Sequence, residues 1–384
     1  MSWRAVLQGA DADAARAAIA RLAVQVAADP LDDPTLIRGA AGAALLHGTL
    51  ARGGDEQAAE RAHAALGRAL ERIGEVAPGP WLGTGFVGVA WVMNHLADVL
   101  PIDDDALAPI DEMVADLLRR PEWPHEYELW QGLVGVGVYA RARGRGDLVA
   151  RAVAHLDRLA ERSEAGATWW NRDFFDFGAL GADPRGYHNL GFALGVAGVI
   201  AFLADAASDG ITAARPLLAE ATRWLLAHDR PHMAPRFPGA IGMAIPAEKL
   251  RNGWCYGDLP VAIAAVRAGT VLGEPGWIAH GRDIARAMAA GPVEDVPDFD
   301  VAFCHGAAGR AHMFNRLGQA LRDDELLAAA HLYYRETLVR LSVQRTLPPH
   351  LNVGACGVAL VLMGAVSASE PTWDSLLLAA IPPA

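Results

Sequence analysis

A Gly-x-x-Gly signature recurs seven times along the chain, and this repeat limits the possible folds more than any other feature. Six copies keep both glycines, and one has a proline in place of the second. Successive copies begin 46 to 63 residues apart, which leaves room for two helices and their loops. A repeat of this length is typical of arrays built from one supersecondary unit. The copies begin at Gly39, Gly85, Gly132, Gly195, Gly257, Gly306 and Gly354.

Each signature opens a stretch of about ten almost uncharged residues, such as 195–204. A helix that is apolar on all sides is buried on all sides. Between these stretches lie segments with apolar residues at helical spacing and many charges, such as 56–73 and 213–228. Strand signals are scarce. The sequence therefore predicts an all-α fold, an α/α toroid in which seven inner helices alternate with seven outer helices.

The glycines are expected at the start of each inner helix. Small residues there would let neighbouring segments approach closely and would leave backbone N–H groups available for a ligand. Two longer links, 168–188 and 228–245, precede the fourth and fifth copies, and we expect them to cap one end of the barrel and to carry substrate contacts. Because the repeat resumes after each link, residues 1–384 are expected to form one domain, with the first outer helix in the first thirty residues.

Charge and composition exclude several classes of function. The net charge of −12 argues against nucleic acid or an anionic membrane as the main partner. Three cysteines are too few for a disulfide framework, so a reducing cytoplasm is the expected location. The most apolar run, 190–204, is shorter than a membrane span, and the first residues lack a signal-peptide pattern. We expect a soluble protein.

Two of the three cysteines lie in short motifs that could hold a metal. Cys255 is in the stretch 251–257, and Cys304 is followed by His305 and Gly306. Two cysteines and a histidine suit Zn²⁺, and a set of three ligands leaves the fourth tetrahedral position open, as in catalytic sites. The two cysteines are far apart in the chain, so the fold would have to bring their loops together. The alternative is a pair of buried thiols without a metal.

The repeats together with Trp254-Cys255-Tyr256-Gly257 and Cys304-His305-Gly306 resemble the lanthionine synthetase C-like family, over essentially the whole chain. The resemblance implies an α/α toroid with a zinc ion held by Cys255, Cys304 and His305. It also implies a cyclase that acts on a dehydrated precursor peptide, beside a partner dehydratase. In this family a cysteine thiol of the precursor adds to dehydroalanine or dehydrobutyrine and forms a lanthionine or methyllanthionine thioether.

The resemblance extends to residues near the expected metal. Arg251 matches the family's active-site arginine, and Tyr256 matches a tyrosine close to the substrate. Two positions depart from the pattern. Leu194 stands where the family has a histidine that carries protons, and Glu128 stands where it has an aspartate. Glu128 alone, or an imidazole from His188 or His125, is then the candidate for proton transfer.

Three interpretations follow from the sequence. The first is a zinc-dependent peptide cyclase that forms thioether rings. The second is a zinc-containing peptide-binding scaffold that has lost catalysis, which Leu194 suggests. The third is another thiol-alkylating α/α-barrel zinc enzyme, such as a prenyltransferase subunit, although the pair of cysteines argues against it. The remaining candidates are interpreted as packing residues: Cys356, His47, His95 and His312.

Overall fold

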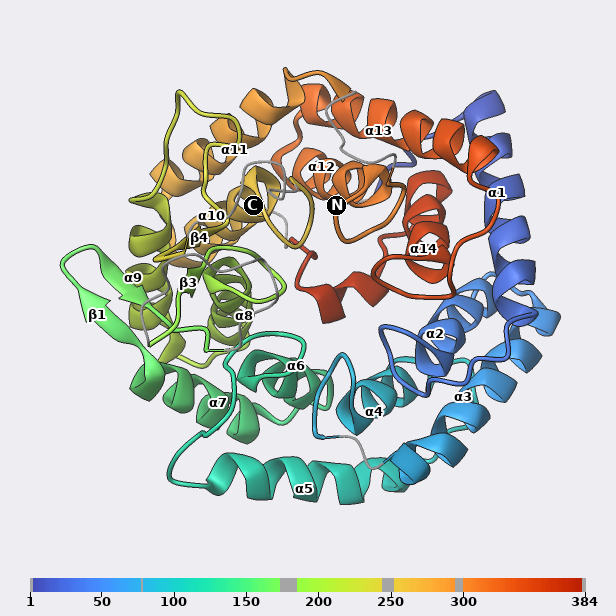
Figure 1. Ribbon diagram of the computed structural model, residues 1–384, viewed down its shortest axis with the longest axis horizontal. Coiled ribbons are helices and arrows are strands. Elements are labelled where there is room, and N and C mark those ends of the chain that lie inside the picture. The colour runs from blue at the N-terminus through green and yellow to red at the C-terminus, as the bar shows by residue number, and fades with distance from the viewer. Residues whose placement is uncertain (1–2, 77–78, 173–184, 244–251, 294–299, 382–384) are drawn as a thin grey trace.

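The computed structural model describes residues 3–76, 79–172, 185–243, 252–293 and 300–381. These residues form fourteen α-helices in two concentric rings, so the predicted α/α toroid of seven inner and seven outer helices is confirmed (Figure 1). The inner helices are α2 (Ala40–Ala51), α4 (Phe86–His95), α6 (Leu133–Ala142), α8 (Val196–Ser208), α10 (Asp258–Leu272), α12 (Ala307–Leu321) and α14 (Ala355–Val366). The outer helices are α1 (Gly9–Ala27), α3 (Glu56–Val76), α5 (Ala108–Arg119), α7 (Gly146–Leu159), α9 (Ala214–Leu226), α11 (Pro275–Ala289) and α13 (Asp324–Val343).

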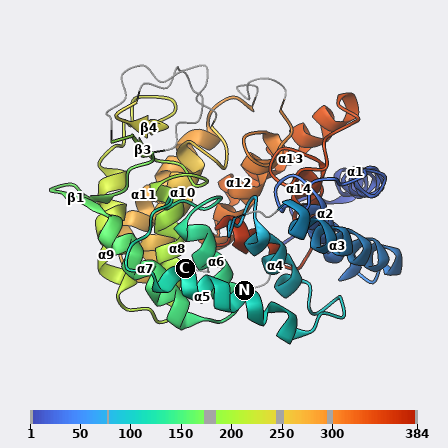
Figure 2. The same cartoon turned by 60° about the horizontal axis from the view of Figure 1, so that its bottom comes forward.

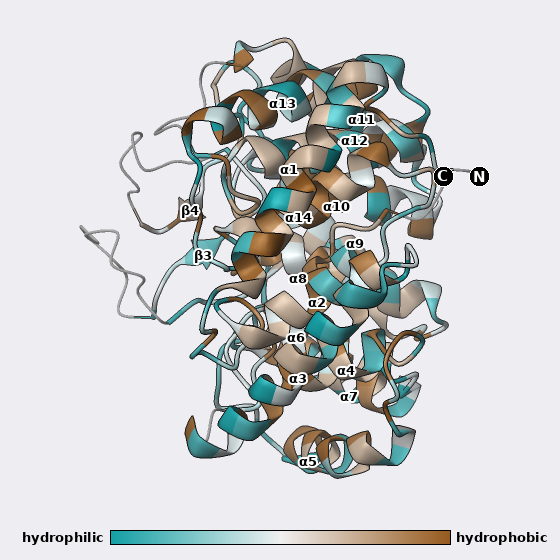
Figure 3. Ribbon diagram, turned by 90° about the vertical axis from the view of Figure 1, so that its right-hand side faces the viewer, coloured by the Kyte–Doolittle hydropathy of each residue, from teal (hydrophilic) through white to brown (hydrophobic). Residues whose placement is uncertain are grey.

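The two rings differ in burial as their sequences predict. In the inner helix α8 nearly every residue is buried, whereas the outer helix α3 buries only one stripe of alanines and a leucine. Polar residues accordingly mix with apolar ones along outer helices such as α3 and α13 (Figure 3). Each inner helix packs against the next, and α14 packs against both α2 and α1. The ring is therefore closed between its first and last helices.

Each signature begins at the residue that precedes an inner helix. The second glycine is needed because the preceding loop folds back over the first turn. A β-carbon at Gly309 would lie 1.7 Å from the carbonyl oxygen of Phe303. Gly257 has φ +113°, a conformation that L side chains rarely adopt. Pro260 is tolerated in the copy without a second glycine because it lies in the first turn of α10, where N–H groups lack a partner within the helix.

The expectation that the first N–H groups of the inner helices stay available for a ligand is wrong. At the start of α12, Ala307 N–H donates to the carbonyl oxygen of Asp300 (3.1 Å), and Ala308 N–H donates to that of Val301 (3.3 Å). At α6, Leu133 N–H donates to the carbonyl oxygen of Glu126 (3.1 Å). The close approach that the glycines permit is used to satisfy these donors within the protein.

We call the seven loops that precede the inner helices the rim loops, residues 33–39, 79–85, 126–132, 189–195, 252–257, 300–306 and 348–354. Backbone hydrogen bonds join each rim loop to the next and the last to the first. They run from Ile37 N to Gly83 O (3.2 Å), Gly83 N to Trp130 O (2.9 Å), Leu129 N to Ala193 O (3.3 Å), Phe192 N to Cys255 O (3.1 Å), Cys255 N to Cys304 O (3.1 Å), Cys304 N to Asn352 O (2.8 Å) and Leu351 N to Ile37 O (3.0 Å). This closed circle fixes the positions of residues from seven distant parts of the chain at one end of the ring.

One short antiparallel ribbon lies just before the first long link, and a second joins the two links. β1 (Glu161–Ser163) pairs with β2 (Gly166–Thr168), and β3 (His188–Asn189) pairs with β4 (Ala240–Ile241). The second link therefore returns to the first, and β3 and β4 lie at one end of the ring (Figure 2). Among the described residues, no helix has both the length and the apolar character needed to cross a membrane.

Candidate metal centre

The structure brings together the three side chains that the sequence singles out as metal ligands. One ligand atom from each of Cys255, Cys304 and His305 lies within 4.8 Å of the other two. Cys255 comes from the rim loop before α10, and the other two come from the rim loop before α12. The two loops belong to neighbouring repeats, so the site lies between adjacent inner helices.

The circle of rim-loop hydrogen bonds positions both cysteines through their backbones. Cys255 N–H donates to the carbonyl oxygen of Cys304, and Cys304 N–H donates to that of Asn352. Gly253 permits the close contact between the two loops, because a β-carbon there would lie 2.4 Å from the α-carbon of His305. Main-chain contacts between neighbouring rim loops thus position the two cysteines.

The three residues fit a zinc ion. Bonds of about 2.0–2.3 Å from Zn²⁺ to sulfur and nitrogen place ligand atoms within about 4.6 Å of one another, close to the spacing of this cluster. The cysteines form no disulfide. Cys255 is buried, whereas Cys304 and His305 are half-buried, so one side of the cluster is accessible. Three ligands with an accessible side match a site with an open fourth position.

Local electrostatics favour the ionised thiol at this site. Hydrogen bonding from Cys304 and from His305 lowers the pKa of Cys255 to about 6, against the opposing effect of burial. Burial lowers the pKa of His305, but hydrogen bonds to Asp300 and Cys255 outweigh it and raise that pKa to about 9. Both pKa shifts favour a thiolate at Cys255 and a protonated imidazole at His305 when no metal is bound.

Asp300 orients the histidine and was missed in the sequence. Its Oδ2 lies 2.5 Å from Nε2 of His305, and its Oδ1 accepts a 2.7 Å hydrogen bond from Ala302 N–H. With Nε2 engaged, Nδ1 is the nitrogen that remains for a metal. A carboxylate on the outer nitrogen of a histidine ligand is the usual way to fix the ring and strengthen its binding.

Tyr256 joins the metal loop to a buried polar network. Its Oη accepts a 3.0 Å hydrogen bond from Nδ2 of Asn189, whose backbone N–H donates to Oδ1 of Asn171 (3.3 Å). Burial raises the pKa of Tyr256, and the charge of Cys255 adds to the effect. Nδ2 of Asn171 in turn donates to the carbonyl oxygen of Leu194 (2.8 Å). The network thus reaches the backbone of the position where the sequence departs from the family pattern, while the Leu194 side chain packs against the core.

Glu128 lies on the rim loop before α6 and is 4 % exposed. Its carboxylate accepts hydrogen bonds from the N–H groups of Trp130 (2.7 Å) and Gln131 (2.6 Å). Its loop connects to the metal loop through the rim loop before α8 and through a contact between the rings of Trp130 and Trp254, whose centroids are 5.5 Å apart. The described contacts place no direct bond between Glu128 and the metal ligands.

The two histidines considered for proton transfer lie elsewhere. Nδ1 of His188 is 2.9 Å from the carbonyl oxygen of Trp169, and its ring lies against that of Trp170 at a tilt of 36°, with centroids 3.9 Å apart. Burial lowers the pKa of His188. The His125 ring lies against Trp81 and Trp123. None of the described contacts of these two imidazoles is with the metal cluster. Arg251 lies outside the described residues.

Comparisons with known proteins agree with this architecture. The family model described as lanthionine synthetase C-like protein matches residues 30–378. A solved structure of a nisin cyclase superposes with a TM-score of 0.73 at 18% sequence identity, covering 95% of this chain and 96% of the other. A search of curated protein sequences found no match. The family match spans most of the chain, so the resemblance seen in the sequence is confirmed, and this protein belongs to the lanthionine synthetase C-like family.

Proposed function

We propose that this protein is a zinc-dependent peptide cyclase. It adds cysteine thiols of a dehydrated precursor peptide to dehydroalanine or dehydrobutyrine residues and forms lanthionine or methyllanthionine rings. The observation that carries the proposal is the cluster of Cys255, Cys304 and His305 on adjacent rim loops, in a chain of the lanthionine synthetase C-like family. A nisin cyclase with the same fold supports it.

We assign different roles at the metal to different residues of the chain. A bound Zn²⁺ would supply a Lewis acid that keeps a substrate thiol deprotonated at neutral pH, where a free thiol with a pKa of about 8.5 is mostly protonated. Cys255, Cys304 and His305 would hold the ion, and Asp300 would hold the His305 ring by its outer nitrogen. The accessible side of the cluster leaves space for the peptide.

Ring closure itself requires no redox chemistry. A carbon–sulfur bond forms at the β-carbon, the carbon–carbon double bond becomes single, and the α-carbon gains a proton that balances the one lost from the thiol. The negative charge that develops on the neighbouring carbonyl oxygen needs a positive or hydrogen-bonding partner. Arg251 and Tyr256 are proposed for this role.

Glu128 is our first candidate for the proton transfer, with His188 second. Two backbone N–H groups hold the Glu128 carboxylate in a fixed position on the rim. A carboxylate held in this way is placed to carry a proton on the rim loop before α6. The peptide would approach along the same rim, from the face that carries the cluster.

We propose a cytoplasmic enzyme that works as one domain over residues 1–384 and receives its substrate from a partner dehydratase. The alternative is a zinc-containing scaffold that binds the peptide without closing rings. The observation that favours this alternative is Leu194, whose side chain cannot carry a proton and packs against the core.

The test is ring closure on a precursor peptide encoded beside the gene and dehydrated beforehand. Mass spectrometry after thiol capping counts the cysteines that remain free. The proposal expects the parent protein to remove free thiols and Cys304→Ala to leave them. A parent that binds zinc and the peptide but closes no rings would favour the scaffold.

A further inference from the structure

The segment that follows α14 lies in the middle of the ring, where it appears in the darkest red (Figure 1). We call residues 370–378 the crossing segment. It contains a 3₁₀ helix, Trp373–Leu377, in which Trp373, Asp374 and Leu377 are at most 1 % exposed. A charged side chain that is fully buried in the middle of the ring needs partners, because an unpaired buried charge is strongly unfavourable.

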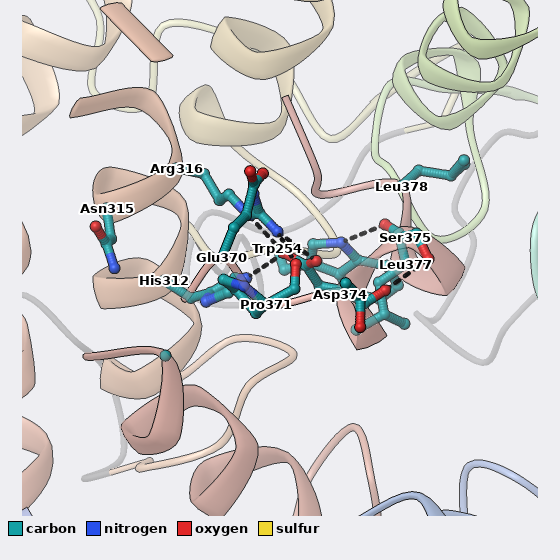
Figure 4. Close-up of polar contacts among 12 residues, drawn as sticks. Trp254, His312, Asn315, Arg316, Glu370, Pro371, Asp374, Ser375, Leu377 and Leu378 are labelled. Atoms are coloured by element: carbon teal, nitrogen blue, oxygen red, sulfur yellow. Dashed lines mark hydrogen bonds and ion pairs between the residues drawn. The ribbon is translucent and has the colours of Figure 1, made fainter. Parts of the chain in front are cut away.

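Asp374 finds its partners on the inner helix α12 (Figure 4). Its Oδ2 lies 2.6 Å from Nε2 of His312 and 2.7 Å from Nε of Arg316, and its Oδ1 lies 2.6 Å from Nη2 of Arg316. Nη2 of Arg316 also donates to the carbonyl oxygen of Pro371 (2.6 Å). Burial opposes ionisation of Asp374, but the charge of Arg316 and the bond to His312 hold its pKa well below the usual range. The crossing segment is thus anchored to α12 by an ionised carboxylate.

The same helix and the same segment reach the metal centre. α12 begins directly after Cys304, His305 and Gly306, and His312 follows His305 by seven residues, about 10 Å along the helix axis. On the other side, Nε1 of Trp254 donates a 3.1 Å hydrogen bond to the carbonyl oxygen of Leu377 (Figure 4). Trp254 directly precedes Cys255. The crossing segment is therefore bonded to α12, which begins just after two of the candidate ligands, and to the rim loop that carries the third.

An aromatic layer fills the space between the segment and the ligands. The rings of Trp254 and Phe303 have centroids 5.4 Å apart, and those of Phe303 and Trp373 are 5.8 Å apart. Trp254 and Phe303 are the residues immediately before the two cysteines, and both are fully buried. A shift of the crossing segment would move this layer, and with it the backbone from which each cysteine extends.

We infer that the crossing segment is a positioning element of the metal centre, and that Asp374, held by His312 and Arg316, fixes it in place. The inference rests on the zinc site proposed above. The competing explanation is that the Asp374 cluster stabilises the fold and has no effect on the metal. The two explanations differ for variants that lower the stability of the protein to a similar extent. If the crossing segment positions the metal centre, only a variant of this segment should weaken zinc binding.

A matched pair of variants separates them. Asp374→Asn removes the charge of the crossing segment. Asp111→Asn removes the charge of another largely buried carboxylate, which accepts from Oη of Tyr139 (2.7 Å) and pairs with Arg143 (3.1 Å) between α5 and α6. His312→Gln is a milder change that leaves the Arg316–Asp374 pair intact. For each full-length, metal-depleted protein, the zinc Kd is measured by competition with a chromophoric chelator, and the melting temperature is recorded without metal.

We expect Asp374→Asn to raise the zinc Kd about ten-fold or more, the scale on which residues behind metal ligands act, and Asp111→Asn to leave it within about two-fold. Both should lower the melting temperature. His312→Gln should raise the zinc Kd by a smaller factor, and it decides the question if Asp374→Asn does not fold. A zinc Kd for His312→Gln and Asp374→Asn equal to that of the parent would overturn the inference. A parent that binds no zinc would instead overturn the proposed metal site.

Discussion

The backbone N–H of Cys255 donates a 3.1 Å hydrogen bond to the carbonyl oxygen of Cys304. The two residues belong to different repeats, and this bond is one of the seven that join the rim loops in a circle. Both candidate cysteine ligands are therefore positioned by the same backbone contacts that close the toroid. The geometry of the site therefore depends on the fold of the whole ring.

The second position of the signature requires glycine where the rim loop lies in close contact with the first turn of the inner helix. Gly309→Ala should shift urea unfolding to lower concentration and cost about 2 kcal/mol or more, because the new β-carbon meets the Phe303 carbonyl oxygen at 1.7 Å. Gly67→Ala is the matched control, since Gly67 lies inside α3 with open space around it. That substitution should stabilise the protein by about 0.5–1 kcal/mol. Equal unfolding midpoints for the two variants would contradict this view of the signature.

The fold should survive removal of the metal. The inner helices form a large apolar core, whereas folding that depends on a metal belongs to small domains that lack one. Circular dichroism after treatment with a chelator should keep its helical signal. A collapse of that signal would mean that the ion is structural.

Zinc binding should release at least one proton near neutral pH. In the metal-free protein Cys255, with a pKa of about 6, is mostly ionised, while His305, with a pKa of about 9, is mostly protonated. A histidine ligand must be neutral and a cysteine ligand must be a thiolate, so His305 has to lose its proton when the metal binds, and any proton held by the cysteines is released as well. Zinc affinity should therefore rise with pH up to about 9 and fall more steeply below about 6, where Cys255 also gains a proton. Calorimetric titrations in buffers of different ionisation enthalpy measure the release, and equal heats in all buffers would count against it.

Glu128→Gln should slow ring closure by roughly 10²-fold or more, the usual scale for a positioned acid or base, and leave the zinc content intact. His188→Ala should cost less. The control is Glu126→Gln on the same rim loop, where the carboxylate accepts a hydrogen bond from Arg172 N–H (3.2 Å). Free thiols counted by mass spectrometry give the rate. If Glu128→Gln and His188→Ala both close rings at the parent rate, neither residue carries the proton.

The double ring could be predicted from the sequence because each signature precedes an apolar segment, and burial follows directly from that composition. The availability of the first N–H groups was predicted wrongly, because the sequence does not reveal that each loop folds back and offers its own carbonyl oxygens. The circle of rim-loop hydrogen bonds could not be predicted from the sequence either. It is made by backbone atoms, which every residue type provides.

Only some of the residues that support the candidate ligands could have been predicted from the sequence. Asp300 lies six positions before Gly306, the same offset as Asp33 before Gly39 and Asn189 before Gly195, so comparing the repeats would have found it. The Asp374 cluster carried no such signal. His312 was interpreted as a packing residue, and it is fully buried, but its bond to Asp374 joins residues 62 positions apart. A contact over that distance in the sequence depends on the position of the crossing segment in the folded ring, which the local sequence does not reveal.

Metal analysis of the purified protein tests the central claim most directly. The parent should hold one zinc ion per chain, and Cys304→Ala should lose it. Cys356→Ala is the matched control, because Cys356 is a fully buried thiol in the first turn of α14 and takes no part in the cluster; it should keep the zinc. Undiminished zinc in Cys304→Ala would contradict the account.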